Sequence, residues 1–477
     1  MADFSAAFTT YELEREKNIK KNEELLASLN LIQHKRDSSY ISESTKKKLP
    51  RQTERPQLKP EPFRMKLRSN SSSKDEESEV LLSNGVLQDD MNNLPERRTG
   101  TNTIAELLAE NNADNIELDL LWKRLYNSHP METCTSNVTS SAERFQQVQK
   151  YAIPSRQGFL KVVPHRIYSV AFAKTAKPLA FAGDKWGYLG IWAPLQENNE
   201  NCLTLQPHIR AISKIFCHTS LNDQIITCSY DGTVRMLSLN HSKYETILDI
   251  ENMLFYDISC LDNGNSFLVA TNAGHLIFID KRDIPSFKAI TLHERKISSV
   301  DAFPDQHTFC TCSHSLVCEW DFRKLSLDIK MHSSPIQTRT HSKAVTAARV
   351  SPCGNFILTT CYDNYLRVFE SSKKAPTSKD AFLYKIPHNN NTGRWITPFV
   401  AEWDPQCDHL FYCASMKKPR GIDLFHMGKT LETNRLVQEN LTSIIPRLAI
   451  HPTTGMIIGG SSSGRVFAFA DYNPNLS

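Results

Sequence analysis

The 477-residue sequence has little net charge and no long apolar run. Its 56 Lys and Arg residues nearly balance 52 Asp and Glu residues, so the formal net charge of +4 does not identify a partner. No apolar run approaches the roughly 18 residues that a membrane-spanning helix needs. The start, residues 1–5, lacks the basic and apolar regions of a signal peptide. We therefore expect no secretion and no membrane partner.

Cysteine patterns and motifs that would indicate a metal site or an enzyme are also missing. The twelve cysteines are scattered, and the close pair Cys310 and Cys312 has no second pair to complete a zinc site. Reduced thiols are then expected, as in a cytosolic or nuclear protein. The sequence has no P-loop, no Gly-x-Ser-x-Gly and no His-Glu-x-x-His. We expect no catalysis, no metal and no cofactor.

One hairpin pattern, in contrast, is repeated along the chain. Residues 182–192 read as a strand, a turn at 184–187 and a second strand, because Asp184 can bond its own backbone and Gly187 can adopt positive φ. The pattern recurs with strand ends at Trp192, Leu237, Ile279, Trp320, Phe369, Phe425 and Phe469. A period of roughly 40–45 residues is typical of four-stranded blades. The sequence predicts an all-β fold, a seven-bladed WD40 β-propeller.

The ring is predicted to close with a strand from its own N-terminal side. Only residues 470–477 follow the last repeat, which leaves no chain for an outermost strand there. We expect residues 159–163 to supply it, since a missing strand would expose unpaired backbone. Histidines recur at similar places in the repeats and are expected to bond neighbouring turns: His208, His293, His341 and His451.

The sequence before the propeller is different in character. We predict an N-terminal helix at 1–32, a disordered basic and serine-rich linker at 33–102, a helical extension at 103–157 and the propeller at 158–477. The first helix could dock on another surface or stand in solvent. Residues 46–51, Lys-Lys-Lys-Leu-Pro-Arg, could be a nuclear import signal or part of a solvated linker.

Several stretches beyond the blade pattern resemble a known family. They are Phe-Ala-Gly-Asp-Lys-Trp-Gly at 181–187, Thr-Gly-Arg-Trp at 392–395, and Pro-Arg-Gly-Ile-Asp-Leu-Phe-His at 419–426. From about residue 158 onward the chain looks like the family of WD repeat protein 76 and the fungal changed-mutation-rate protein, relatives of the small subunit of the UV-damaged-DNA-binding complex. The resemblance implies a nuclear protein that binds double-stranded DNA, with a preference for UV damage, and acts in the DNA damage response and DNA metabolism.

Basic residues at corresponding places in the repeats predict a DNA-binding face. Residues just before a first strand and residues in the turn after a second strand should emerge on the same face, where they can meet phosphates. In the damage-binding relative, positions like Arg166, Lys185 and Lys296 contact DNA phosphates. Each could instead be an ordinary solvated charge. The candidates are Arg166, Lys185, Trp186, Lys296, Arg394, Trp395, Lys417, Lys418 and Arg420.

The stretch around Trp395 departs from the damage-binding relative. That relative inserts a Phe-Gln-His hairpin tip at the lesion, and the corresponding residues here, 392–395, lack the triplet. Trp395 could serve as an aromatic wedge or stacking platform, or it could be a buried strand residue packed between blades. We expect general DNA affinity but not lesion recognition by the relative's mechanism.

Two strand ends suggest a second site on the opposite face. Asp280 and Arg282 close one blade, and Trp320, Asp321 and Arg323 close the next. The Trp-Asp-x-Arg sequence resembles the motif by which propellers dock on the adaptor of a cullin-RING ubiquitin ligase, with Arg323 as an exposed contact. The aspartates could instead only stabilise the turns. A ligase substrate receptor that captures chromatin proteins, and a plain interaction scaffold, therefore remain alternatives to DNA binding.

Overall fold

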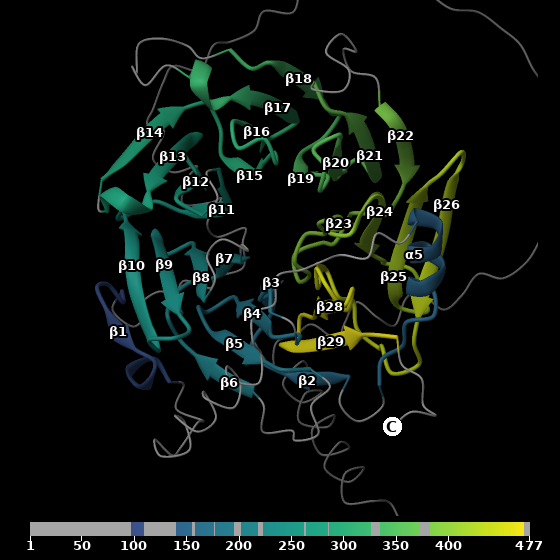
Figure 1. The fold of residues 1–477 in the computed structure, drawn as a ribbon, viewed down its shortest axis with the longest axis horizontal. Coiled ribbons are helices and arrows are strands. Elements are labelled where there is room, and N and C mark those ends of the chain that lie inside the picture. The colour runs from purple at the N-terminus through teal and green to yellow at the C-terminus, as the bar shows by residue number, and fades with distance from the viewer. Residues whose placement is uncertain are drawn as a thin grey trace, which may run out of the picture. The chain divides into compact units, whose positions relative to one another are not determined.

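Seven antiparallel sheets surround a central channel, which confirms the predicted seven-bladed propeller (Figure 1). The computed structural model describes residues 97–108, 140–154, 158–175, 177–194, 202–217, 223–261, 264–284, 286–325, 334–372 and 382–471. The predicted N-terminal helix, the basic segment at 46–51 and most of the predicted linker lie outside these residues.

Each blade runs from an inner strand at the channel to an outer strand at the rim. Blades one to four are β3 (Ile167–Phe172), β4 (Ala180–Asp184), β5 (Leu189–Trp192) and β6 (Cys202–Leu205); β7 (Ile212–Cys217), β8 (Gln224–Ser229), β9 (Thr233–Ser238) and β10 (Lys243–Asp249); β11 (Phe255–Cys260), β12 (Ser266–Thr271), β13 (His275–Asp280) and β14 (Phe287–Thr291); and β15 (Ile297–Ala302), β16 (Thr308–Ser313), β17 (Leu316–Asp321) and β18 (Gln337–Thr340). Blades five to seven are β19 (Val345–Val350), β20 (Phe356–Cys361), β21 (Tyr365–Glu370) and β22 (Phe382–Pro387); β23 (Glu402–Asp404), β24 (Cys407–Ala414), β25 (Gly421–Met427) and β26 (Leu431–Val437); and β27 (Arg447–Ile450), β28 (Ile457–Gly460), β29 (Arg465–Phe469) and β2 (Phe159–Lys161).

Blade seven is completed by a strand from the other end of the ring, as the sequence predicts. Strand β2 pairs antiparallel with β29, with Phe159 opposite Phe467 and Lys161 opposite Arg465. The strand itself ends at Lys161, and the next two backbone N–H groups donate to the Gly464 carbonyl. This pairing removes the open edge that blade seven would otherwise expose.

The core lies between neighbouring blades, so the middle strands are buried on both faces. Strand β12 is buried along its whole length, and Phe267 within it packs in one cluster with Phe255 of its own blade and Ile226 of blade two. Strands covered on both faces read as nearly continuous apolar runs, which is why the strands before the repeated turns are rich in Ile, Leu, Val and Phe.

The turn that defines the repeat has the chemistry that its residues predict. Asp184 Oδ1 accepts the N–H groups of Trp186 at 2.8 Å and Tyr188 at 2.9 Å. Gly187 has a φ of +82°, and a Cβ there would lie 2.1 Å from the His208 carbonyl oxygen. Glycine is therefore required both by the backbone conformation and by the close approach of the next connection.

Three of the four recurring histidines bond within their blades, and all three bond a second-strand threonine where bonds to neighbouring turns were expected. The Nε2 atoms of His208, His293 and His341 lie 2.8 to 3.0 Å from threonine hydroxyls on a second strand, namely those of Thr227, Thr311 and Thr359. The prediction is wrong for the position of His451, which lies in the turn between β27 and β28, at the other end of the inner strand. It bonds the Thr453 hydroxyl at 3.0 Å instead.

Residues 97–108 pack on the outside of blade two, where the sequence predicts a helix from residue 103. They form β1 (Asn102–Thr103) and the short 3-10 helix η1 (Ala105–Leu107), and β1 pairs with β10. Ile104 and Leu107 are buried in the core shared by blades one and two. Strand pairing and this burial outweigh the local helix preference, so the predicted helix is limited here to the three residues of η1. Residues 109–139 are not described.

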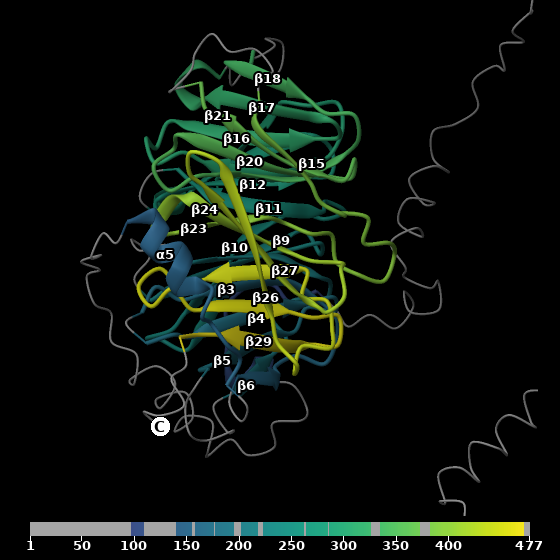
Figure 2. The same ribbon diagram turned by 90° about the vertical axis from the view of Figure 1, so that its right-hand side faces the viewer.

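Helix α5 (Ser141–Val148) falls within the predicted helical extension and packs on blades six and seven (Figures 1 and 2). Ser140 and Glu143 form a capping box that starts the helix. Phe145 and Val148 are buried against β24 and β25, and Arg144 is buried beside Asp404. In the described part of the chain, no helix is long and apolar enough to cross a membrane, and no three His, Cys, Asp or Glu side chains are placed to hold a metal ion.

Candidate nucleic-acid interface

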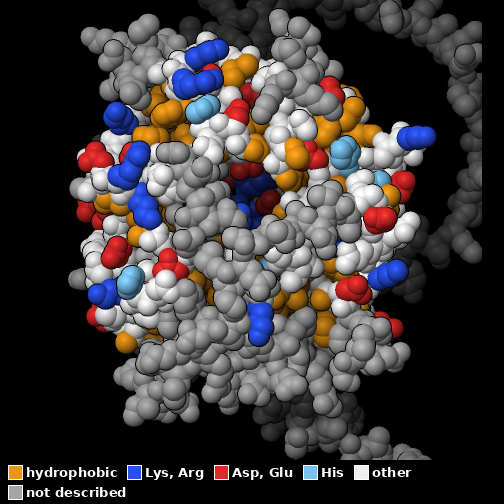
Figure 3. Space-filling model, viewed as in Figure 1, with side chains coloured by type: hydrophobic (Ala, Val, Ile, Leu, Met, Phe, Trp, Pro, Cys, Tyr) orange, Lys and Arg blue, Asp and Glu red, His pale blue; other side chains and the backbone are white. Residues whose placement is uncertain are grey.

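The two faces of the ring carry different connections. One face, here called the turn face, carries the turns between second and third strands, such as 185–188, and the connections into each inner strand, such as 292–296. The other, the helix face, carries α5, η3 (Lys281–Asp283) and η4 (Phe322–Lys324) and is the one seen in Figures 1 and 3. All nine candidate DNA-binding residues lie on the turn face by this topology, although their contact with DNA stays a prediction.

Arg166 and Arg394 meet on the turn face although they are far apart in sequence. Arg166 Nη1 donates to the Arg394 carbonyl oxygen at 2.9 Å, and Nη2 donates to the Tyr168 hydroxyl at 2.6 Å. The Arg394 guanidinium carbon lies 5.5 Å from the centre of the Trp395 ring, which is a cation–π distance. The connection into blade six is thus joined to the start of blade one, two blades further along the ring.

Three tyrosines extend this arrangement to Lys296. The rings of Tyr168 and Tyr230 are 6.1 Å apart, and those of Tyr230 and Tyr256 are 5.0 Å apart. Lys296 Nζ lies 5.1 Å from the centre of the Tyr256 ring. We call the resulting set the cation–aromatic row: Trp395, Arg394, Arg166, Tyr168, Tyr230, Tyr256 and Lys296.

The tyrosines of the row were not predicted. Tyr168 and Tyr256 belong to inner strands, and Tyr230 belongs to the turn after β8. Desolvation raises the pKa of Tyr230 and of Tyr256, so both hydroxyls stay protonated and can donate. The signal that could have found them is the one used for the cations, namely a shared place at the turn-face ends of successive blades.

Lys185 and Trp186 lie directly beside the row. The Lys185 N–H donates to the Arg166 carbonyl oxygen at 3.0 Å, and its ammonium lies 4.6 Å from the centre of the Trp186 ring. The three cations Arg166, Lys185 and Arg394 are therefore held close together, each against an aromatic ring.

Trp395 is exposed, so the alternative that it packs between blades is wrong. The exposed fraction of Trp395 is 76%. The backbone around it is anchored, because the Thr397 hydroxyl donates to the Ile167 carbonyl at 2.7 Å and the Ser462 hydroxyl donates to the Trp395 carbonyl at 3.4 Å. An exposed indole on an anchored loop can stack on a base without first being freed from a core.

Lys417, Lys418 and Arg420 occupy the turn between β24 and β25 on blade six. Both lysines are exposed, whereas Arg420 is half-buried and its guanidinium donates to the Met416 carbonyl. The turn thus adds two solvent-exposed cations to the turn face, with Arg420 helping to close the loop.

Carboxylates in the repeated turns of this face are bonded internally. Asp231 accepts bonds from His208 and Thr233. Burial alone would raise the pKa of Asp363, but hydrogen bonds from Arg367 and from Ser342 lower it to about 2. The negative charges of Asp231 and Asp363 are thus compensated within their own blades.

On the helix face, two Asp–Arg pairs close consecutive blades in the same geometry. Arg282 donates to both carboxylate oxygens of Asp280 at 2.9 and 2.7 Å, and Arg323 does so to Asp321 at 3.0 and 2.9 Å. The arginine side chains are 65% and 63% exposed. The aspartates also cap η3 and η4 by accepting an N–H, so they hold the turns while presenting the arginines.

Trp320 cannot contact a partner, because it is 2% exposed. Its indole N–H donates to the Thr311 hydroxyl at 2.8 Å, and that hydroxyl is also bonded to His293. The prediction that Trp320 belongs to the partner site is wrong, because it is a core residue of blade four, whereas Asp321 and Arg323 lie at the end of the blade.

Seven four-stranded blades, threonine-bonded histidines and the Trp-Asp strand end define a WD40-repeat β-propeller protein. The family model described as "WD domain, G-beta repeat" matches residues 199–237 and 333–370. The fold and the repeats thus agree with the class that the sequence predicts.

Comparison with curated proteins identifies several relatives of this chain. The chain is 35% identical over 320 residues to WD repeat-containing protein 76 of Xenopus laevis, covering 65% of this chain and 54% of that protein. It is 29% identical over 498 residues to the Mus musculus protein of that name, covering 98% and 75%. It is 25% identical over 535 residues to DNA damage-binding protein CMR1 of Scheffersomyces stipitis, covering 97% and 100%. The chain is a homologue of these proteins, which confirms the resemblance; its match spans about half the length of the frog relative.

Proposed function

We propose that this protein binds double-stranded DNA through its turn face, prefers UV-damaged duplexes, and acts in the nucleus in the DNA damage response. The observation that carries the proposal is the cation–aromatic row, which places Arg394, Arg166 and Lys296 against rings across one face. The name of the CMR1 homologues, DNA damage-binding protein, supports the same function. The proposed role is binding, without catalysis.

The cations of this surface and the exposed Trp395 would have different roles. Arg166, Lys185, Lys296 and Arg394 would contact phosphates, which supplies affinity and makes it salt-dependent. Trp395, exposed beside Arg394, would stack against a base where damage has already weakened the duplex. A damaged site costs less to unstack than an intact one, so the preference follows from the energy of the DNA rather than from base contacts.

The test is binding of the full chain to undamaged and UV-irradiated duplexes across a salt series. Lys185→Glu with Arg394→Glu should weaken binding to both duplexes and lower the slope of log affinity against log salt by about 1.8, since about 0.9 is lost for each of the two phosphate contacts. Trp395→Ala should reduce the damaged-to-undamaged ratio with little change in slope. A matched control, Lys288→Glu with Lys324→Glu, reverses two exposed charges away from the turn face and should bind normally. Absence of affinity at low salt in the unaltered protein would refute the proposal.

A second function is favoured by the two Asp–Arg pairs. We propose that Arg282 and Arg323, exposed on the helix face, dock the propeller on the adaptor of a cullin-RING ubiquitin ligase. Because η and ε nitrogens of each arginine are already bonded to aspartate, the guanidinium is oriented before a partner arrives. Arg323→Ala should abolish capture of the purified adaptor and leave DNA affinity unchanged. If the Arg323→Ala protein still captures the adaptor, Arg323 is not the docking contact. The protein would then be better described as an interaction scaffold that does not use this arginine.

A further inference from the structure

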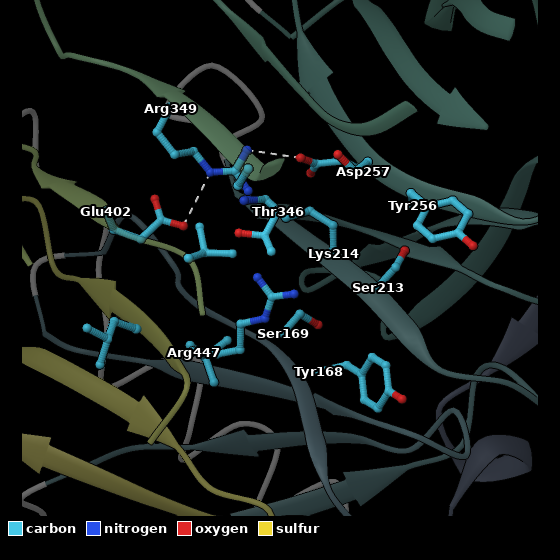
Figure 4. A pocket seen from close by; sticks show the side chains of 15 residues that line it. Tyr168, Ser169, Ser213, Lys214, Tyr256, Asp257, Thr346, Arg349, Glu402 and Arg447 are labelled. Atoms are coloured by element: carbon cyan, nitrogen blue, oxygen red, sulfur yellow. Dashed lines mark hydrogen bonds and ion pairs between the residues drawn. The ribbon is translucent and has the colours of Figure 1, made fainter. Parts of the chain in front are cut away.

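Three tyrosines lie side by side at the turn-face ends of blades one, two and three. The rings of Tyr168 and Tyr230 are 6.1 Å apart, and those of Tyr230 and Tyr256 are 5.0 Å apart. All three residues are half-buried, so their rings pack together while part of each residue stays open to solvent. Figure 4 shows the rings of Tyr168 and Tyr256 on one side of the channel, with their hydroxyl groups directed away from Arg349 and Arg447. We call the three residues the tyrosine trio.

The hydroxyl groups of the trio are protonated and available as donors. Desolvation, and then the neighbouring phenols, raise the pKa of Tyr230 and of Tyr256. In the part of the chain that the structure describes, neither of these hydroxyls has a hydrogen-bond partner, and neither oxygen is sealed from solvent. The Tyr168 hydroxyl accepts a bond of 2.6 Å from Arg166 Nη2, which leaves its own hydrogen free to donate. The trio therefore offers three O–H donors beside the channel.

Cations flank the trio at both ends. The Arg166 guanidinium carbon lies 5.0 Å from the centre of the Tyr168 ring, and Lys296 Nζ lies 5.1 Å from the centre of the Tyr256 ring. The connection that carries Lys296 has a second exposed cation beside its one carboxylate, Glu294. The potential at both ends of the trio is therefore set by positive groups.

The nearby carboxylates have other partners. Arg349 Nη1 lies 2.9 Å from Asp257 Oδ2, and Arg349 Nε lies 3.3 Å from Glu402 Oε1. Asp231, next to Tyr230, accepts its bonds from its own blade. The acceptor for the trio thus comes from outside the described residues, as water or as an anionic group. The flanking cations favour an anionic group, because hydrogen bonds to a charged acceptor are the stronger kind and opposite charges at short range add to them.

We propose that the tyrosine trio donates hydrogen bonds to a backbone phosphate of bound double-stranded DNA, between the contacts of Arg166 and Lys296. This inference rests on the proposed DNA binding and adds three contact residues to it. Side-chain hydroxyls commonly donate to phosphate oxygens, and such contacts position a duplex without reading its sequence. A neutral O–H displaces no counterion, so its contribution to affinity does not vary with salt as that of a lysine or arginine does.

The test removes two hydroxyl groups and keeps the rings. Tyr230→Phe with Tyr256→Phe should weaken binding of the full chain to undamaged and UV-irradiated duplexes equally, by at least about tenfold. The slope of log affinity against log salt should stay that of the unaltered protein. The melting temperature should also stay the same, because the ring packing is kept. Tyr168 is left intact, because its hydroxyl also accepts the bond from Arg166.

Two comparison variants separate this effect from a change of charge and from the loss of any tyrosine hydroxyl. Lys296→Met should weaken binding and lower the salt slope by about 0.9, since it removes one cationic phosphate contact. Tyr384→Phe removes a hydroxyl that donates to the Gly428 carbonyl from the outer strand β22, and it should bind both duplexes normally.

The other outcomes overturn the inference. Affinity of Tyr230→Phe with Tyr256→Phe within about twofold of a DNA-binding unaltered protein would mean that the hydroxyls do not contact DNA. A lower salt slope, or a loss confined to UV-irradiated duplexes, would mean that the trio does not act as a neutral phosphate contact. A lower melting temperature would assign the hydroxyls to the fold. Failure of the proposed DNA binding would be seen first, in the unaltered protein at low salt, and this inference would fall with it.

Discussion

Replacing Arg144 by methionine should detach helix α5 from the propeller and lower its stability strongly. Arg144 is 2% exposed, and its Nε donates to the fully buried Asp404 at 3.1 Å. The other guanidinium nitrogens donate to the Tyr151 hydroxyl at 2.8 Å and to the Gly455 carbonyl at 3.1 Å. One charged group therefore joins a helix outside the repeats to blades six and seven.

The expected magnitude follows from what the substitution leaves behind. Methionine can fill much of the volume, so the main cost is a buried carboxylate that loses its counter-charge and acceptors that lose their donors. Breaking one partner of a buried pair costs about 3–5 kcal/mol. Asp404 keeps the Gln406 N–H at 2.8 Å and the Tyr412 hydroxyl, which places our expectation at the lower end, about 3 kcal/mol.

The assay is equilibrium unfolding in urea. The midpoint of the transition measures the overall stability, and a probe on α5 measures the release of this helix. Arg144→Met with Asp404→Asn should recover at least about 1 kcal/mol relative to the single change, because the neutral amide keeps the Gln406 bond and no longer needs a cation. Gln146→Ala, an exposed change on the same helix, should stay within about 0.5 kcal/mol. A loss below about 1 kcal/mol in Arg144→Met, with no recovery in the double variant, would refute the reasoning.

Three further perturbations test the fold. Gly187→Ala, whose Cβ would lie 2.1 Å from the His208 carbonyl oxygen, should lower the melting temperature far more than Gly393→Ala, where φ is also positive but nothing lies within 4 Å. Burial lowers the pKa of His293 to about 4 from 6.5, so the unfolded chain binds more protons between these values. Stability should then fall as the pH drops from about 6.5 to about 4, by on the order of 3 kcal/mol, and His293→Gln should flatten that part of a melting-against-pH curve. Leu107→Ala, which truncates a fully buried side chain outside the repeats, should cost about 2–5 kcal/mol in urea unfolding, whereas a loss below about 1 kcal/mol would show that residues 97–108 are not part of the core.

Much of the fold could be predicted because its determinants are local. The turn at Asp184 and Gly187 bonds within itself, and its recurrence counts the blades. Closure by β2 could be predicted because an unpaired outer edge in the last blade would be costly, and β2 does pair with β29 there. Where local preference and tertiary packing disagreed, as at Thr103 and Ile104, the predicted long helix gave way to a strand and a single 3-10 turn, since pairing with β10 and burial between two blades outweigh a weak helix propensity.

The candidate site was predicted only in part. The repeat pattern alone predicts that Arg166, Lys296 and Arg394 lie at blade ends. It does not predict which residues they contact. Trp395 and Trp320 illustrate the difference, because both are tryptophans near blade ends, and only the packing around them makes one exposed and the other buried.

The sequence by itself therefore determined the number of blades, the chemistry of their turns, the closing strand and the face on which each charged residue emerges. The tertiary structure alone decided that Tyr168, Tyr230 and Tyr256 adjoin one another, and that Arg349 contacts both Asp257 and Glu402 in the channel. The physical reason is that a repeat pattern specifies where a side chain lies within its own blade. Contacts across the channel depend on how seven inner strands converge, and no local spacing encodes that convergence.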